Sequence, residues 1–280
     1  MKMTAFFLLL AAITLSALSV PAQQQIAWHR EYKEAAALAR ETGKPMILDF
    51  WAIWCGPCKK MEQDFWPRED VVALSDRFIF VKVDVDKEPR IRSKFGVGAI
   101  PHIIFIDPWG VVLTSFHGFG GNAPDVKALK TISVIPQDFS RISDAQNTLE
   151  KDKKDLAALY KVANFYNEKT FYLLSNDFYQ RVLELETLPD KRQETMFKVG
   201  FNFLRSNAPD DALDVFDKFQ KEFPQTEKTE GILFGRVAAY QKKGKLKEAQ
   251  KNLALLKTAF PNSPLIPNAE KLIAELDQKK

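Results

Sequence analysis

Two cysteines separated by two residues constrain this chain more than any other feature of its sequence. Cys55 and Cys58 are its only cysteines, and they follow a compact apolar run, Met46 to Trp51, that has the pattern of a buried strand. A bridge between residues so close together closes a loop too short to stabilise a fold appreciably. Exported domains that depend on disulfides for stability are usually small and rich in cysteine. The pair therefore indicates chemical reactivity at a turn between a strand and a helix.

A zinc site is the other chemistry that such a pair could serve. Zinc in proteins usually takes four ligands from clustered Cys, His and carboxylate side chains. The three histidines, His29, His102 and His117, show no such clustering with the cysteines. We therefore expect neither a metal nor a cofactor.

The first 22 residues have the pattern of a secretory signal peptide. Lys2 precedes an apolar run from Thr4 to Val20, and the small residues Val20 and Ala22 occupy the −3 and −1 positions of a cleavage site. A retained membrane anchor is the alternative, although the run is slightly short for a membrane span. We expect residues 1–22 to be removed and the protein to be periplasmic or otherwise exported.

The composition is that of an ordinary globular protein, with 46% hydrophobic and 27% charged residues. A length of 280 residues suits about two domains. The formal net charge of +4 is mixed along the chain, which gives no reason to expect a nucleic-acid partner.

The chain up to residue 136 alternates strands and helices. The expected elements are helices over 31–42, 88–95 and 125–132, strands over 46–51 and 78–85, and a hairpin of 103–106 and 111–115. The hairpin surrounds the turn sequence Asp107-Pro108-Trp109-Gly110. This order predicts an α/β domain whose mixed central sheet carries helices on both faces.

The remainder of the chain has a different pattern. Residues 137–154 lack a clear period, so we expect a linker there, and residues 155–280 have helical spacing throughout. Leu188-Pro189, Phe223-Pro224 and Phe260-Pro261 recur at intervals of 35 and 37 residues. This recurrence resembles divergent tetratricopeptide repeats, in which antiparallel helix pairs stack into a curved solenoid. An irregular helical bundle is the alternative for this all-α domain.

The sequence Cys55-Gly56-Pro57-Cys58 supports a two-step exchange mechanism. Cys55 lies where a helix begins, and the unpaired N–H groups and dipole of that helix favour its thiolate. Pro57 is tolerated in the first turn because an N–H there would have no intrahelical partner. We expect Cys58 to be more buried and to resolve the mixed disulfide that Cys55 forms with a substrate.

The stretch from Asp49 to Lys59 resembles the active site of thioredoxins almost residue for residue. Ile100-Pro101 lies where that family has its cis-proline loop, and Gly118 fits the glycine that follows the hairpin. The resemblance implies a thioredoxin fold, which we expect over residues 23–136. The segments Gly43-Lys44-Pro45 and Asp64-Phe65-Trp66-Pro67 are more similar to the exported domain that ends the membrane carrier reducing periplasmic disulfides.

The resemblance also implies roles for individual residues. Asp49 acts as the proton acceptor of Cys58, because burial raises the pKa of its carboxyl, and Lys82 on the next strand moderates this charge. A structural carboxylate with ordinary titration is the alternative for Asp49. Pro101, if cis, allows Ile100 to pair with an extended substrate. Trp54 flanks the site.

The dipeptide between the cysteines and Ile100 favour a disulfide reductase or reductase-isomerase over an oxidant. A reductase outside the membrane implies a protein disulfide as substrate and a membrane-embedded electron donor. His102 stands where the family commonly has threonine; near Cys55 it would favour an oxidant, and the alternative is a strand residue that points elsewhere. A non-catalytic scaffold is the competing class of function. We favour a combination in which the helical repeats bind a protein partner and the cysteine pair does the chemistry.

Overall fold

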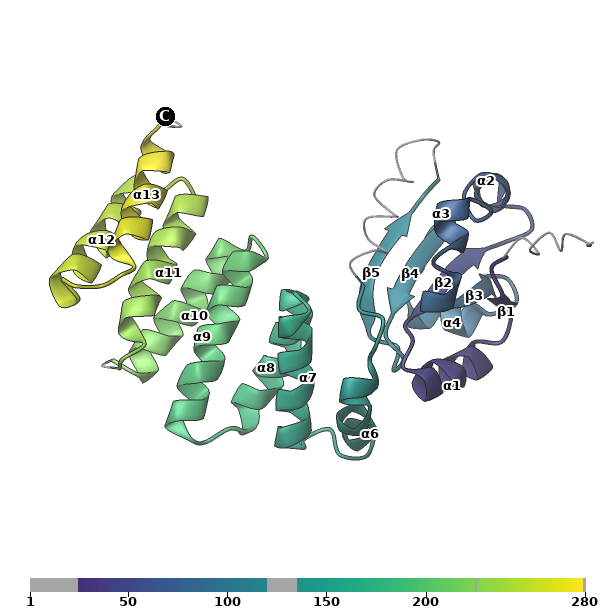
Figure 1. Cartoon of the computed structure of the whole chain (residues 1–280), viewed down its shortest axis with the longest axis horizontal. Coiled ribbons are helices and arrows are strands. Elements are labelled where there is room, and N and C mark those ends of the chain that lie inside the picture. Colours follow the sequence, from purple (N-terminus) through teal and green to yellow (C-terminus); the bar gives the residue numbers. More distant parts are fainter. Residues whose placement is uncertain (1–24, 120–134, 225, 279–280) are drawn as a thin grey trace, which may run out of the picture.

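The computed structural model describes residues 25–119, 135–224 and 226–278. Figure 1 shows two parts, a sheet flanked by helices and a row of helices that runs to the C-terminus. The expected signal peptide and the helix expected over residues 125–132 lie outside the described residues. The predicted order, an α/β domain followed by an all-α domain, is confirmed.

A five-stranded sheet organises the first part. Its strands are β1 (Trp28–His29), β2 (Met46–Trp51), β3 (Ile79–Asp84), β4 (His102–Ile106) and β5 (Val112–His117). They lie in the order β1-β3-β2-β4-β5, with the first three parallel and with β4 antiparallel to β2 and β5 to β4. The predicted strands and hairpin are confirmed to within two residues at each end, and β1 is an additional strand.

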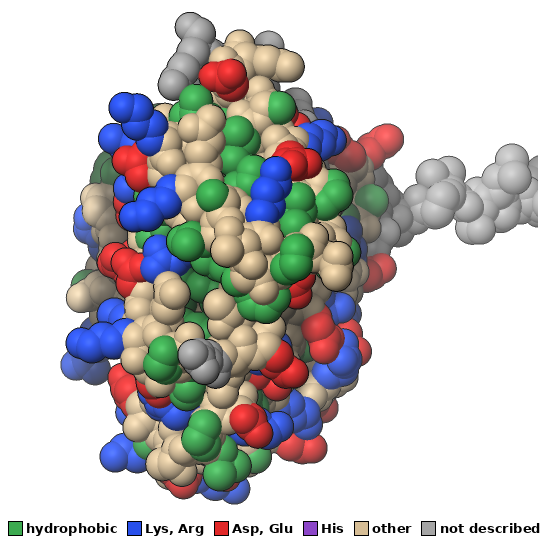
Figure 2. Space-filling view, turned by 90° about the vertical axis from the view of Figure 1, so that its left-hand side faces the viewer, with side chains coloured by type: hydrophobic (Ala, Val, Ile, Leu, Met, Phe, Trp, Pro, Cys, Tyr) green, Lys and Arg blue, Asp and Glu red, His purple; other side chains and the backbone are tan. Residues whose placement is uncertain are grey.

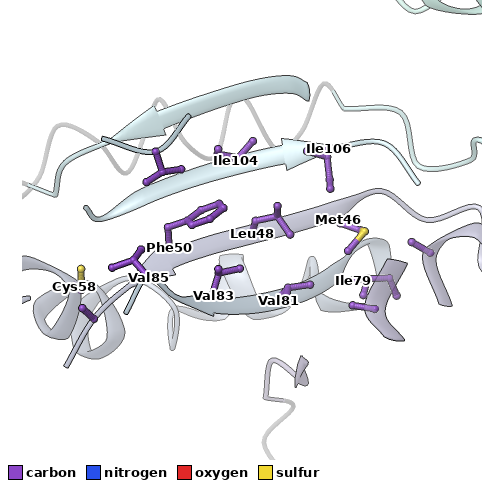
Figure 3. Close-up of a cluster of buried hydrophobic side chains, with 14 of the residues drawn as sticks. Met46, Leu48, Phe50, Cys58, Ile79, Val81, Val83, Val85, Ile104 and Ile106 are labelled. Carbon is purple, nitrogen blue, oxygen red and sulfur yellow. The ribbon is translucent and has the colours of Figure 1, made fainter. Parts of the chain in front are cut away.

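Alternate side chains of the strands face two layers of helices. Met46, Leu48 and Phe50 belong to the cluster that α1 (Tyr32–Thr42) and α4 (Pro89–Lys94) cover, and Figure 3 shows them beside the apolar residues of β3 and β4. Ile47 and Phe80 belong to the cluster on the other face, under α2 (Gly56–Asp64) and α3 (Glu69–Val72). Because of this alternation, Asp49, the one acidic residue of β2, faces α2.

The second part is helical over its described residues. It contains a short 3₁₀-helix (Ser140–Ile142), α6 (Ser143–Lys151), α7 (Leu156–Glu168), α8 (Tyr172–Leu185), α9 (Pro189–Arg205), α10 (Pro209–Glu222), α11 (Thr229–Lys242), α12 (Leu246–Ala259) and α13 (Ile266–Asp277). The expectation of an irregular linker over 137–154 is corrected here. Phe139, Ile142 and Leu149 are buried in the same core as α7 and α8, so this stretch folds as part of the helical region.

Helix pairs repeat along this part. The pair α9–α10 is followed by the pair α11–α12, and the two buried alanines Ala212 and Ala249 take equivalent places in α10 and α12. Gly244 provides the turn between α11 and α12, with a φ of 70° that favours glycine. Figure 2 views the end of the row formed by α12 and α13, where basic and acidic side chains interleave among hydrophobic ones. Lys257 and Glu270 form an ion pair of 2.6 Å between these two helices.

The two parts meet at the end of the sheet away from the cysteines. In the antiparallel pair, Phe50 lies opposite His102 and Met46 lies opposite Ile106. The turn that follows β4 is therefore at the opposite end of the sheet from the turn that follows β2, as the positions of α6 and α2 in Figure 1 show. Leu113 of β5 packs against the cores of both parts, so they share apolar contacts.

Asp107 makes a buried polar contact at this junction. Its side chain is fully buried, and Oδ1 accepts the N–H groups of Trp109 and Val111 at 2.8 Å each. Oδ2 accepts the hydroxyl of Tyr166, on α7, at 2.5 Å. Burial raises the pKa of Asp107 to about 6, although the hydrogen bond from Tyr166 opposes this shift. One carboxyl thus fixes its own turn and ties it to the helical region.

Candidate active site

The two cysteines lie at the start of α2 and form a disulfide. Cys55 is the N-cap of this helix, and its Sγ accepts the backbone N–H of Cys58 at 3.2 Å. Pro57 lies in the first turn, as expected. An N–H directed at Sγ and the helix dipole both stabilise negative charge on that sulfur. The site therefore favours a thiolate at Cys55 when the disulfide is reduced.

The expected difference in burial between the cysteines is absent from the disulfide form. Cys55 is 3% exposed and Cys58 is 5% exposed, so both are almost fully buried. The two sulfurs are bonded to each other and packed against the same apolar cluster, which leaves neither side chain open to solvent. Selectivity between them rests on the N–H that Cys55 accepts rather than on exposure.

A buried polar cluster lies on the face of the sheet that α2 covers. Asp49 of β2 lies directly beside Lys82 of β3 in the parallel register, as the sequence predicted. Oδ2 of Asp49 accepts hydrogen bonds from Nζ of Lys82 at 2.7 Å and from Nε1 of Trp66 at 3.1 Å. Nζ of Lys82 also binds Glu62 of α2. Asp49 is 1% exposed, so its charge is held inside the domain.

Burial dominates the electrostatics of this cluster. It raises the pKa of the Asp49 carboxyl, while the positive charge and hydrogen bond of Lys82 act in the opposite direction. Glu62 adds a second negative charge that raises the pKa of Asp49 further. The predicted direction of the shift is confirmed, and its physical cause is the desolvation expected for an acid in an apolar strand.

A small cavity of about 240 Å³ connects the cluster to the cysteine pair. Its lining includes Cys58, Trp51, Glu62 and Lys82, with Arg30 and Lys59 completing the wall. The ring of Trp51 lies 5.7 Å from Nζ of Lys82. Cys58 thus borders the same cavity as Lys82 and Glu62, two members of the cluster around Asp49.

The loop before β4 is the second part of the site. The Ile100–Pro101 peptide is cis, as predicted, and Gly118 N donates to the carbonyl of Pro101 at 2.9 Å. His102 lies in β4 opposite His117 of β5, with ring centroids 5.8 Å apart. Burial, followed by the charge of His117, lowers the pKa of His102. An imidazole with a lowered pKa is neutral near pH 7, and a neutral ring does not stabilise a thiolate by charge.

Two large apolar side chains directly before Cys55 in the sequence are exposed. Ile53 is 70% exposed and Trp54 is 65% exposed. The indole N–H of Trp54 donates to Oδ2 of Asp86, in the turn after β3, at 2.7 Å, which holds the exposed ring in place. Exposed apolar side chains next to reactive groups are suited to contacting a partner protein.

Three residues of the site were not indicated by the sequence pattern: Glu62, Trp66 and Asp86. Glu62 lies four residues after Cys58, and that spacing on a helix was a usable signal, because residues at i and i+4 share a face. Trp66 and Asp86 lie beyond local spacing, because the bonds to Asp49 and Trp54 cross 17 and 32 residues of sequence.

Comparisons with known proteins agree with this architecture. Residues 27–108 match the family model described as thioredoxin-like, and residues 194–226 match a tetratricopeptide repeat. The chain is 41% identical to a thioredoxin of Alicyclobacillus acidocaldarius subsp. acidocaldarius over 61 residues, which are 22% of this chain and 56% of that protein. It is 42% identical to a thioredoxin of Malassezia sympodialis over 62 residues, which are 22% of this chain and 58% of that protein.

A solved structure described as a DsbH oxidoreductase aligns at 22% identity and a TM-score of 0.37, covering 45% of this chain and 96% of that one. The chain matches the two thioredoxins named above over little more than half of their own length. The family models cover one segment in each of the two parts that the structure shows. The chain therefore joins a thioredoxin-like domain to a region of tetratricopeptide-type helical repeats.

Proposed function

We propose that this protein is an exported thiol–disulfide oxidoreductase that reduces or isomerises disulfides of other proteins. The observation that carries the proposal is the hydrogen bond from Cys58 N–H to Sγ of Cys55 at the start of α2. This contact stabilises the thiolate that attacks a substrate, and a stabilised thiolate is the requirement for exchange at neutral pH.

The reaction balances without a cofactor. The thiolate of Cys55 attacks one sulfur of a substrate disulfide, forms a mixed disulfide and releases the other substrate sulfur as a thiolate. Cys58 then loses its proton to Asp49 and attacks Sγ of Cys55, which forms the Cys55–Cys58 disulfide and releases the second substrate thiolate. Two electrons pass from the cysteine pair to the substrate.

The direction of transfer follows from the residues beside the cysteines. Gly56 and Pro57 occur between the cysteines of reducing thioredoxins, and Ile100 before the cis-proline is consistent with the same use. The lowered pKa of His102 supports this direction, because a neutral ring does not make the disulfide more oxidising by stabilising the thiolate of Cys55. Reduction is the direction that we propose.

The reduction potential tests this direction. We expect the mature protein, equilibrated against glutathione and dithiothreitol buffers, to have a potential of about −270 mV or lower, as thioredoxin has. A value above about −180 mV would contradict reduction and make the protein an oxidant. In that case His102→Thr is the first variant to examine, because it removes the ionisable ring that follows the cis-proline at the start of β4.

Export and electron supply form the second part of the proposal. The signal-peptide pattern of residues 1–22 supports export, and the similarity of the Gly43 and Asp64 segments to an exported reductase domain supports the same location. A reductase in an oxidising compartment consumes electrons at each turnover, so a membrane-embedded dithiol donor has to reduce the pair again. Over the part of the chain that the structure describes, no helix has the length and apolar character needed to cross a membrane.

The helical repeats are proposed to bind the protein substrate or another protein partner. Stacked helix pairs of this kind offer extended surfaces for protein binding. A chain that ends at Pro224 lacks α11 to α13 but keeps α7 and the junction with the thioredoxin-like domain. Since repeats depend mainly on their neighbours for stability, the rest of this shortened chain should stay folded.

We expect this truncation to slow reduction of a folded protein substrate by about tenfold, since binding through a second site raises the local concentration of the substrate. Stopped-flow assays would measure the rates at which the full and shortened chains reduce two substrates. One is a protein trapped by the Cys58→Ser variant, and the other is a small aromatic disulfide. The small disulfide should react at the parental rate. Equal rates of the full and shortened chains with both substrates would contradict a role of α11 to α13 in substrate binding.

A further inference from the structure

Trp66 has a hydrogen bond to the buried acid Asp49 that distinguishes it from an ordinary core aromatic. Its ring is 3% exposed and meets the rings of Trp28 and Phe65 edge to face, each at a centroid distance of 5.0 Å. Its Nε1 donates to Oδ2 of Asp49 at 3.1 Å, across the interior of the domain. An indole N–H only donates and does not titrate in the range of protein function. The bond to Asp49 therefore persists whether the carboxyl is charged or neutral.

The two oxygens of Asp49 have different surroundings. Oδ2 accepts two N–H groups, from Lys82 and from Trp66. Oδ1 is buried and has no hydrogen-bond partner. A proton placed on Oδ2 would point toward two donors, which is unfavourable, whereas a proton on Oδ1 meets no donor. Two fixed donors thus distinguish the oxygens of one carboxyl.

Lys82 by itself does not fix this arrangement. Its Nζ is shared between Asp49 and Glu62, so its single positive charge faces two carboxylates. The side chain of Glu62 is 51% exposed, which allows it to move and to draw Nζ toward solvent. Trp66 is anchored by packing against Trp28 and Phe65, and within the described residues its N–H donates to Asp49. Its N–H is the constant contact of Oδ2.

We propose that Trp66 is a positioning residue whose indole N–H, together with Lys82, occupies Oδ2 of Asp49 and so assigns Oδ1 as the atom that accepts and returns the proton of Cys58. The inference rests on the proposed function, in which Asp49 is the base for Cys58. When Cys58 attacks the mixed disulfide, its proton moves to Oδ1 of Asp49, and the released substrate thiolate or water later takes it up. No oxidant or reductant beyond the cysteine pair and its substrate enters this step.

The test is the titration of Asp49 in the full mature chain, followed by carbon NMR of its carboxyl, in the parent and in Trp66→Phe. Phenylalanine keeps an aromatic ring at this position but has no N–H. We expect the titration midpoint of Asp49 to rise by about one pH unit, because a donor to the charged form is lost. The pH profile of mixed-disulfide resolution, measured by quenched flow, should shift in the same direction and by a similar amount.

Two further variants separate positioning from packing. Phe65→Leu loses aromatic contact with Trp66 but leaves the N–H in place, so its titration midpoint should equal that of the parent. Replacement of Trp66 by 3-benzothienylalanine keeps the shape of the indole without the N–H and should reproduce the shift even if Trp66→Phe folds poorly. An unchanged midpoint in the benzothienyl variant, or an equal shift in Phe65→Leu, would overturn the proposal.

The failure of this inference is distinguishable from failure of the proposed function. The NMR titration reports the bond between Trp66 and Asp49 without any turnover. Asp49→Asn reports the base role directly, because asparagine keeps the shape and cannot accept the proton. Resolution at the parental rate in Asp49→Asn would overturn the role of Asp49 as base, whatever the NMR result with Trp66→Phe.

Discussion

Replacing Cys58 by serine is expected to lower turnover by on the order of a thousandfold or more and to leave the protein bound to its substrates. Cys55 keeps its place at the N-terminus of α2 and still attacks substrate disulfides. The resolving thiol is missing, so the mixed disulfide accumulates. Non-reducing electrophoresis and mass spectrometry of the trapped adducts would identify the substrate proteins and locate the linkage at Cys55.

The matched control is Cys55→Ser, which should be equally inactive but should trap much less substrate. Its remaining thiol, Cys58, lacks the N-cap position that stabilises a thiolate. Trapping at similar levels by the two variants would contradict the assignment of Cys55 as the attacking residue. Retention of activity in both variants would show that the activity does not depend on the cysteine pair.

The junction between the two parts should be sensitive to a single carboxyl. Asp107→Ala leaves the N–H groups of Trp109 and Val111 and the hydroxyl of Tyr166 without their acceptor inside the protein. Each buried group left unpaired costs about 1–3 kcal/mol, so we expect a loss of about 3 kcal/mol or more. Urea unfolding followed by circular dichroism would measure it. Tyr166→Phe, which removes one of the three bonds, should cost about 1–3 kcal/mol.

The same carboxyl gives the junction a defined pH dependence. The pKa of Asp107 is raised by burial from 3.8 to about 6, so the folded protein binds this proton more tightly than the unfolded chain does. Its contribution is fully present below about pH 4 and is lost as pH rises through about 6. The difference of about two pH units corresponds to about 3 kcal/mol. Asp107→Asn, which stays neutral, should remove this part of the pH dependence.

Urea unfolding of the parent and of Asp107→Asn at pH 5 and pH 7.5 would check the sign. The free energy of unfolding of the parent should fall between these values by more than that of the asparagine variant. A parent that gains stability relative to Asp107→Asn as pH rises would show that Asp107 is better stabilised as a carboxylate, by its three hydrogen bonds, than burial penalises it.

Local sequence was sufficient for most of the first part. The apolar run of β2 and the turn before β5 were visible because a buried strand and a turn each have a signal within a few neighbouring positions. The irregular stretch over 137–154 was misjudged because α6 is short and its apolar residues are spaced for burial against α7, which no local pattern reveals. Propensity is weak evidence where tertiary packing decides the conformation.

The sequence period of the helical repeats corresponds to specific contacts between helices. Their period was visible in the sequence, and the structure expresses it as hydrogen bonds between α7 and α9. Asn167 binds Asn202 at 2.9 Å and Tyr160 binds Thr195 at 3.2 Å, each pair separated by 35 residues. Equivalent positions of neighbouring units meet because each unit repeats the geometry of the last.

The sequence by itself determined the reactive pair, the strand that carries Asp49 and the helical period of the second part, because each depends on residues near one another in the chain. Tertiary structure alone decided that Trp66 reaches Asp49 and which end of the sheet carries the repeats. The bond from Trp66 to Asp49 spans 17 residues of sequence, and the bond from Tyr166 to Asp107 spans 59. Such contacts form only when the intervening chain has folded. Their energies depend on burial, which is a property of the packed protein and not of any segment of it.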